Sequence, residues 1–274
     1  MLPLLKSINR IHVRYSTGEQ PVLVECDDMH NYICKYRRSV ASGYKLVSEL
    51  IGSIFASHWG IATPPIAFVD ILPQHGGPLI DSRCSRQICF GSRMNNNTVD
   101  VTRISVEQIQ VNMKNIEAIT RLALFDIWLS NEDRNRNNAN LLYDVKRHEI
   151  VAIDHGCLFN TSDYGAKLSL LTESDTIINA DIGVHLLRNI SFNSYYLVFE
   201  KEVNDMFKYI EECRKDIQYI LNNVPSEWRV DKGDIEYTLR QVFNSEWIDK
   251  CQDIAYDYCE ESIVRAHNES NIDK

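Results

Sequence analysis

The chain has 274 residues, of which 44% are hydrophobic and 24% are charged. This composition is typical of a globular protein and excludes a disordered tail, a collagen and a low-complexity scaffold. The length suggests one large domain or two lobes of unequal size. The net charge of −9 argues against nucleic acid as a partner, because proteins that bind phosphate backbones broadly are usually basic.

Three sequence features bear on the cellular compartment. No window reaches the roughly 18 uninterrupted apolar residues of a membrane span. Charged residues interrupt the apolar start of the chain, so no secretory signal is expected. The 8 cysteines include no CxxC pair, which predicts reduced, mostly buried thiols and argues against structural zinc. We therefore expect a cytoplasmic protein with no membrane partner.

The first third of the chain has the signals of a β-rich unit with one helix. Short runs of β-branched, aromatic and other apolar residues predict strands at 11–15, 21–26, 32–36 and 66–72. Apolar residues at helical spacing predict a helix within 43–60. Gly60 is a plausible end for this helix, and the two prolines that follow it favour extended chain.

From about residue 105 the apolar periodicity becomes helical. The predicted elements are a mostly buried helix at 116–130, two short strands at 140–143 and 149–153, and helical regions at 196–221 and 235–264. This order predicts an α+β protein. A small β-rich N-terminal lobe, residues 1–90, would precede a larger and mainly helical C-terminal lobe, residues 91–274.

The most informative residues lie in the polar segment after the predicted helix at 116–130. Asp133 is followed five positions later by Asn138, and Asp154 ends a short apolar strand in the tripeptide Asp-His-Gly. Phosphoryl transfer uses such a set: one carboxylate binds the attacking hydroxyl, while an amide oxygen and a second carboxylate bind Mg²⁺. Asn and Asp are also common in ordinary loops. The spacing and the strand before Asp154 favour the catalytic interpretation.

The β-rich lobe supplies two complementary residues. Lys35 lies in the middle of a predicted strand, and a lysine that faces inward is costly unless it is paired. Glu49 lies in the helix that follows. A strand lysine and a glutamate on the next helix form the clamp that binds the α- and β-phosphates in kinases.

The loop that would cover the phosphates is the weakest motif. It contains Ser16, Thr17 and Gly18, with a single glycine in place of G-x-G-x-x-G. Backbone amides there can bind phosphate, and a plain hairpin turn accounts for the loop equally well.

Two runs of sequence resemble the HipA-like kinases, a bacterial branch of the protein-kinase fold. They are FDIWLSNEDRNRNNANLL with IVAIDHG, and PVLVECDD with YICKYR and LVSELIGSIFASHWGIATPP. The resemblance covers most of residues 10–160. It implies a two-lobed protein-kinase-like fold, ATP and Mg²⁺ as cofactors, and a serine or threonine of a protein as the phosphate acceptor. An antitoxin-type protein partner is a further implication.

The resemblance also implies roles for individual residues. Asp133 would be the catalytic base, Asn138 and Asp154 the Mg²⁺ ligands, and Lys35 with Glu49 the ATP clamp. Phe90 and Gly91, within the segment CFGSR, would lie near the adenine. The HipA toxins often carry a histidine where this chain has Asn135, and they are larger, so toxin biology transfers less readily than ATP chemistry.

Three alternatives stay open from the residues alone. The chain is a kinase fold that binds nucleotide without catalysis, a small-molecule or lipid kinase, or a metal-dependent phosphodiesterase that uses Asp126 with Asp133 and Asp154. Arg134 and Arg136 are interpreted as solvated loop charges or structural ion pairs rather than phosphate ligands. His155 is interpreted as a packing or hydrogen-bonding residue.

Overall fold

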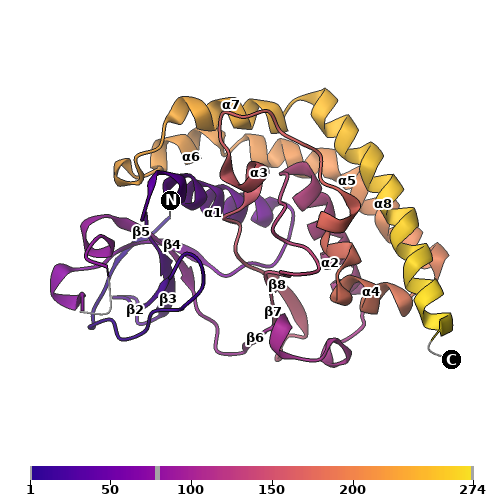
Figure 1. Ribbon diagram of the computed structural model, residues 1–274, viewed down its shortest axis with the longest axis horizontal. Coiled ribbons are helices and arrows are strands. Elements are labelled where there is room, and N and C mark those ends of the chain that lie inside the picture. The colour runs from indigo at the N-terminus through magenta and orange to yellow at the C-terminus, as the bar shows by residue number, and fades with distance from the viewer. Residues whose placement is uncertain (1, 78–80, 273–274) are drawn as a thin grey trace.

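A five-stranded sheet occupies one end of the molecule and a group of helices the other, with the helix α1 (Val40–His58) between them (Figure 1). The computed structural model describes residues 2–77 and 81–272. The sheet contains β1 (Leu4–Lys6), β2 (Val22–Glu25), β3 (Asn31–Lys35), β4 (Ile66–Asp70) and β5 (Ile88–Arg93).

The sheet has the order β1-β4-β5-β3-β2, in which only β1 and β4 run parallel. Its outer face packs on a small apolar cluster that includes Val22, Cys34 and Val69. Its inner face contributes Phe68 and Phe90 to the main core, which it shares with α1. The sheet is therefore buried on both faces, and successive residues of β3 point to different environments.

Helix α1 begins where Ser39 and Ser42 form a capping box, in which each side chain accepts from the other residue's backbone N–H. The helix buries Leu46, Leu50 and Phe55 in the main core. It ends before Gly60, whose φ of 62° favours glycine. This helix packs against β5 on one side and against helices of the C-terminal part on the other.

The C-terminal part begins with a small sheet and a buried helix. The strands β6 (Thr98–Asp100), β7 (Leu141–Asp144) and β8 (Glu149–Ala152) pair in antiparallel fashion. Helix α2 (Met113–Trp128) begins at Asn112, whose side chain accepts from the backbone N–H of Asn115. Trp128 stacks on Trp59 with ring centroids 5.6 Å apart, so the end of α2 packs against the end of α1.

The remaining helices surround α2 and α1 (Figure 1). They are α3 (Leu158–Ser162), α4 (Asp181–Arg188), α5 (Phe192–Arg214), α6 (Ile217–Asn223), α7 (Lys232–Val242) and α8 (Ser245–Ile272). None of the helices within the described residues is long and apolar enough to cross a membrane. The eight cysteines form no disulfide within the described residues, and all but Cys157 are buried, which agrees with the prediction of reduced, mostly buried thiols.

The predicted α+β arrangement, a small β-rich part followed by a larger helical part, is confirmed. The predicted strand at 11–15 is wrong. Arg14 forms an isolated bridge to Val22, and Ile11 leaves the sheet to pack into the outer apolar cluster. Strands β1, β5 and β6 were not predicted, and the two long helical regions each divide into two helices.

Candidate active site

Lys35 is the cation at the centre of the site. On β3, Cys34 points into the outer cluster, and Lys35 points to the opposite face, toward α1. Its side chain is 15% exposed. The Nζ atom donates to Oε1 of Glu49 and lies 2.8 Å from Oδ1 of Asp154. Because successive side chains of β3 point to opposite faces of the sheet, the Lys35 ammonium reaches two carboxylates from distant parts of the chain.

Glu49 connects three segments of the chain. It lies on the buried face of α1 and is 3% exposed. One carboxylate oxygen accepts from Lys35, and the other accepts from the backbone N–H of His155 at 3.1 Å. The helix therefore fixes the position of β3 and of the segment that follows β8 through a single side chain.

The charges of these three groups depend on one another. Burial disfavours the charged form of Lys35, but the attraction of Glu49 and Asp154 outweighs it and raises the Lys35 pKa. Burial also disfavours the Asp154 carboxylate, but Lys35 outweighs this effect and lowers the Asp154 pKa well below its usual range. Burial raises the pKa of Glu49 to about 7, against the opposing attraction of Lys35. At neutral pH the ammonium of Lys35 and the carboxylate of Asp154 are both charged.

Asp154 follows β8 and has a φ of 56°, a conformation that is uncommon for residues other than glycine. Its side chain is 39% exposed, so one side of the carboxylate faces solvent. A Cβ on Gly156 would lie 3.3 Å from both Asp154 Oδ1 and Glu49 Oε1. The glycine of Asp-His-Gly therefore lets the backbone approach the two carboxylates closely.

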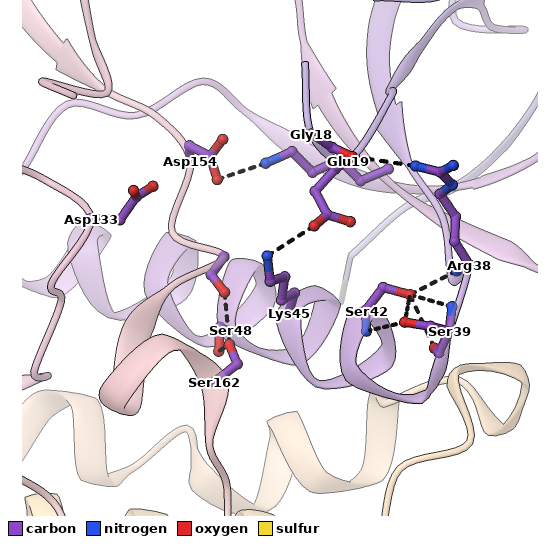
Figure 2. A network of polar contacts seen from close by, with 12 residues as sticks. Gly18, Glu19, Arg38, Ser39, Ser42, Lys45, Ser48, Asp133, Asp154 and Ser162 are labelled. Carbon is purple, nitrogen blue, oxygen red and sulfur yellow. Dashed lines mark hydrogen bonds and ion pairs between the residues drawn. The ribbon is translucent and has the colours of Figure 1, made fainter. Parts of the chain in front are cut away.

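Asp133 lies in the loop between α2 and β7 and shares an open space with Asp154 (Figure 2). The side chain of Asn140 donates to its Oδ2 atom at 2.9 Å. Backbone hydrogen bonds between Asn135 and Asn138 close the loop. Within the described residues the side chain of Asn138 makes no hydrogen bond to the protein, which leaves its amide oxygen available.

Arg134 anchors this loop from the inside. It is fully buried, forms an ion pair with Asp126, and donates to the carbonyl oxygen of Ile153 at 2.9 Å. The structural ion pair considered for this residue is therefore present. Arg136, in contrast, is 63% exposed and lies 3.5 Å from Asp181. Because Asp126 is buried against Arg134, it is not available as the metal ligand that the phosphodiesterase alternative requires.

The short segment after Gly156 has an unusual backbone. Residues 159–162 all have positive φ values, between 52° and 64°. Backbone hydrogen bonds from Phe159 and Asn160 to the carbonyls of Leu129 and Ser130 support this turn. The hydroxyl of Ser162 donates to the carbonyl of Gly156 at 2.7 Å. Such strained residues persist only where the surroundings fix them, and here they attach the Asp154 segment to the end of α2.

The loop with Ser16, Thr17 and Gly18 is exposed and lies beside the same space. Arg38 donates to the carbonyl of Gly18 at 3.3 Å, and Glu19 pairs with Lys45 of α1 at 2.9 Å. Neither contact was predicted, because each joins a loop to a separate segment of the chain. The one sequence signal near them is that Lys45 lies one helical turn from Glu49.

Phe90 and Gly91 lie on β5, with Phe90 directly opposite Lys35 in the sheet register. Phe90 is 2% exposed and packs in the main core. A Cβ on Gly91 would approach Val69 to 2.7 Å, on the other face of the sheet. Both residues are therefore near Lys35 along the backbone, and neither presents a side chain to solvent.

No group of three or more His, Cys, Asp and Glu side chains among residues 2–77 and 81–272 is arranged to bind a metal ion. The polar groups that do converge are three carboxylates and a lysine. Lys35, Glu49 and Asp154 are in direct contact, and Asp133 is the neighbour of Asp154 (Figure 2).

The fold resembles that of a known kinase. The crystal structure of CtkA, a proinflammatory kinase of Helicobacter pylori, superimposes with a TM-score of 0.51. The two chains are 13% identical, and the match covers 93% of this chain and 99% of that chain. At this identity the likeness shows a shared fold. No curated protein matches the sequence.

The family is shown by the sequence itself. The family model described as "HipA-like kinase" matches residues 8–256, which is most of the chain. The chain belongs to this family, and the predicted resemblance is confirmed. The assignment supports a kinase-like phosphotransferase.

We predict that Gly52→Ala destabilises the protein. A Cβ at this position would lie 2.4 Å from the Cβ of His155, so α1 and the Asp154 segment would have to separate. Such overpacking typically costs about 1–3 kcal/mol of unfolding free energy. Urea denaturation measures the loss. Gly18→Ala is the control, because nothing lies within 4 Å of its added Cβ, and equal stability of the two variants would contradict the prediction.

Arg134→Ala should destabilise the protein far more than Arg136→Ala. Removing Arg134 leaves the Asp126 carboxylate buried without its cation, which costs about 3–5 kcal/mol. Arg136 is exposed, and such pairs contribute about 0–1 kcal/mol. Thermal unfolding of both variants measures the difference. If Arg134→Ala fails to fold, Arg134→Lys should fold with a lowered transition temperature, and a variant as stable as wild type would contradict this role.

Proposed function

We propose that this chain is an ATP-dependent phosphotransferase that moves the γ-phosphate of ATP to a hydroxyl, on a serine or threonine of a protein. The observation that carries the proposal is the Lys35 ammonium between Glu49 and Asp154, with Asp133 beside them. The family assignment supports the same chemistry. The lobes would be residues 1–90 and 91–274, with the adenine near Phe90 and Gly91.

The available groups fit Mg²⁺. This ion prefers oxygen ligands and needs only one or two protein carboxylates, because phosphate oxygens and water complete its shell. Asp154 offers a partly exposed ionised carboxylate, and Asn138 offers an amide oxygen without another partner. These two residues would bind the ion, which would neutralise the phosphates and orient them for transfer.

The residues of the chain would divide the remaining work. Lys35 would bind the α- and β-phosphates, and Glu49 would fix its position. Asp133 would accept the hydrogen of the attacking hydroxyl, while Asn140 orients the carboxylate through its bond to Oδ2. Such a site accelerates transfer mainly by positioning and by charge neutralisation.

A second candidate function is a nucleotide-binding module without catalysis. The single glycine of the loop at 16–18 favours it, as does the attachment of this loop to α1 through Glu19 and Lys45. The set of Asp133, Asn138 and Asp154 favours catalysis. A cytoplasmic protein substrate and an antitoxin-type partner remain hypotheses that follow from the family.

Asp133→Asn should reduce phosphoryl transfer by about 10²–10⁴-fold, because the hydroxyl loses its general base. It should leave ATP affinity unchanged. Asp154→Asn should reduce transfer and also weaken Mg²⁺-dependent ATP binding. The measurements are label transfer from γ-labelled ATP to lysate proteins and thermal shift with ATP, with and without Mg²⁺.

The matched control is Asp249→Asn, an exposed aspartate on α8, which should behave as wild type. Transfer by Asp133→Asn at the wild-type rate would remove Asp133 from the mechanism. ATP binding by the wild type without any transfer or turnover would favour the non-catalytic module.

A further inference from the structure

Lys45 is a second lysine at the candidate active site. It lies on α1 one turn before Glu49, so the two side chains share a face of the helix. That face borders the space that Asp133 and Asp154 share (Figure 2). The Lys45 side chain is 30% exposed, so it can reach a ligand from where it stands.

Glu19 is the present counter-ion of Lys45. Its carboxylate extends from the loop toward α1 and lies 2.9 Å from the ammonium. In Figure 2 this carboxylate lies below the loop at Gly18 and above Lys45, with Asp154 on the other side of the Lys45 ammonium. An anionic side chain therefore already pairs with Lys45, at the ammonium that a phosphate of a bound nucleotide would contact.

The surroundings of the Cys157 thiol locate these charges independently. Burial raises its pKa to about 12, Asp133 and Asp154 add to the increase, and Lys35 and Lys45 oppose it. All four groups therefore contribute to the electrostatic potential at this thiol, and Figure 2 shows Asp133, Asp154 and Lys45 in the same part of the molecule.

The balance of charge in this space opposes an anionic ligand. The acidic and basic side chains that border it are Glu19, Glu49, Asp133 and Asp154, with Lys35 and Lys45. Lys35 already has two carboxylate partners. Lys45 has only a partly exposed glutamate on a loop, and such pairs are weak. A phosphate would therefore disrupt less ion-pair energy by binding Lys45 than by binding Lys35.

We propose that Lys45 binds the terminal phosphates of the nucleotide, and that Glu19 is the counter-ion which the phosphates displace. This inference rests on the proposed binding of ATP. The exchange would free the loop at Glu19 while Arg38 still binds the carbonyl of Gly18. A side-chain ammonium would thus supply the phosphate contact that a loop with a single glycine cannot supply through its backbone.

The experiment compares two variants that the exchange affects in opposite directions. Lys45→Met removes the phosphate contact and should weaken binding of Mg²⁺-ATP by about 10- to 100-fold. Glu19→Gln removes the competing carboxylate and should tighten it by about two- to fivefold. Adenosine, which has no phosphate, should bind both variants as it binds the wild type. Isothermal titration calorimetry measures all of these affinities.

Two further variants separate binding from folding. Lys45→Arg keeps the charge and should recover most of the ATP affinity, while Lys208→Met, on an exposed position of α5, controls for the change in net charge. Thermal unfolding without nucleotide checks that each variant is folded.

Several results would overturn the inference. If the Glu19–Lys45 pair only supports the structure, both Lys45→Met and Glu19→Gln will weaken ATP and adenosine alike. Wild-type ATP affinity in Lys45→Met would also overturn it, and would leave the proposed function intact. Failure of the wild type to bind ATP at all would overturn both.

Discussion

The site depends on one buried ammonium. Lys35 carries its charge into a space where burial disfavours it, and Glu49 and Asp154 compensate. A buried charge that loses a partner is strongly destabilising, so β3, α1 and the segment after β8 are constrained to meet at one point. Helix α1 makes this possible. It is buried between the sheet and the C-terminal helices, and at Gly52 it lies against the side chain of His155.

The secondary structure elements that follow from a local sequence pattern were predicted. The alternation of β3, the apolar spacing of α1 and the hairpin of β7 and β8 each follow from short stretches of sequence. Strand β5 was not recognised, because Gly91 and Ser92 weaken its signal, and its pairing with β3 and β4 decides its structure. The run at 11–15 has strand-like composition, yet only Ile11 is buried and the backbone pairs too sparsely for a strand.

The sequence pointed to Lys35 and to the acids of the candidate site, because an inward-facing lysine needs a partner and the spacing of the Asp and Asn residues matches that of a phosphoryl-transfer site. Two features could not be decided or found from the sequence. Arg134 lies in one of the most polar stretches of the chain, where a solvated charge and a structural ion pair fit equally well, and only the fold reveals that it is fully buried. The pair of Glu19 and Lys45 joins a loop to a helix, and nothing in either segment alone indicates the other. Contacts made by tertiary packing leave little trace in the local sequence.

If the chain binds ATP as proposed, its acidic side chains repel the phosphates at close range. Charges farther away than about 10 Å are largely screened at physiological salt, so the net charge of −9 matters less than the groups around Asp154. Glu49 is paired with Lys35 and His155. Asp133 accepts from Asn140, and Glu19 is paired with Lys45. A divalent cation at Asp154 would offset the remaining repulsion, and a lysine released from its own glutamate would add a second positive charge without changing the composition of the site. Under the proposed function, the acidic surroundings would make nucleotide affinity depend on both the metal and the loop.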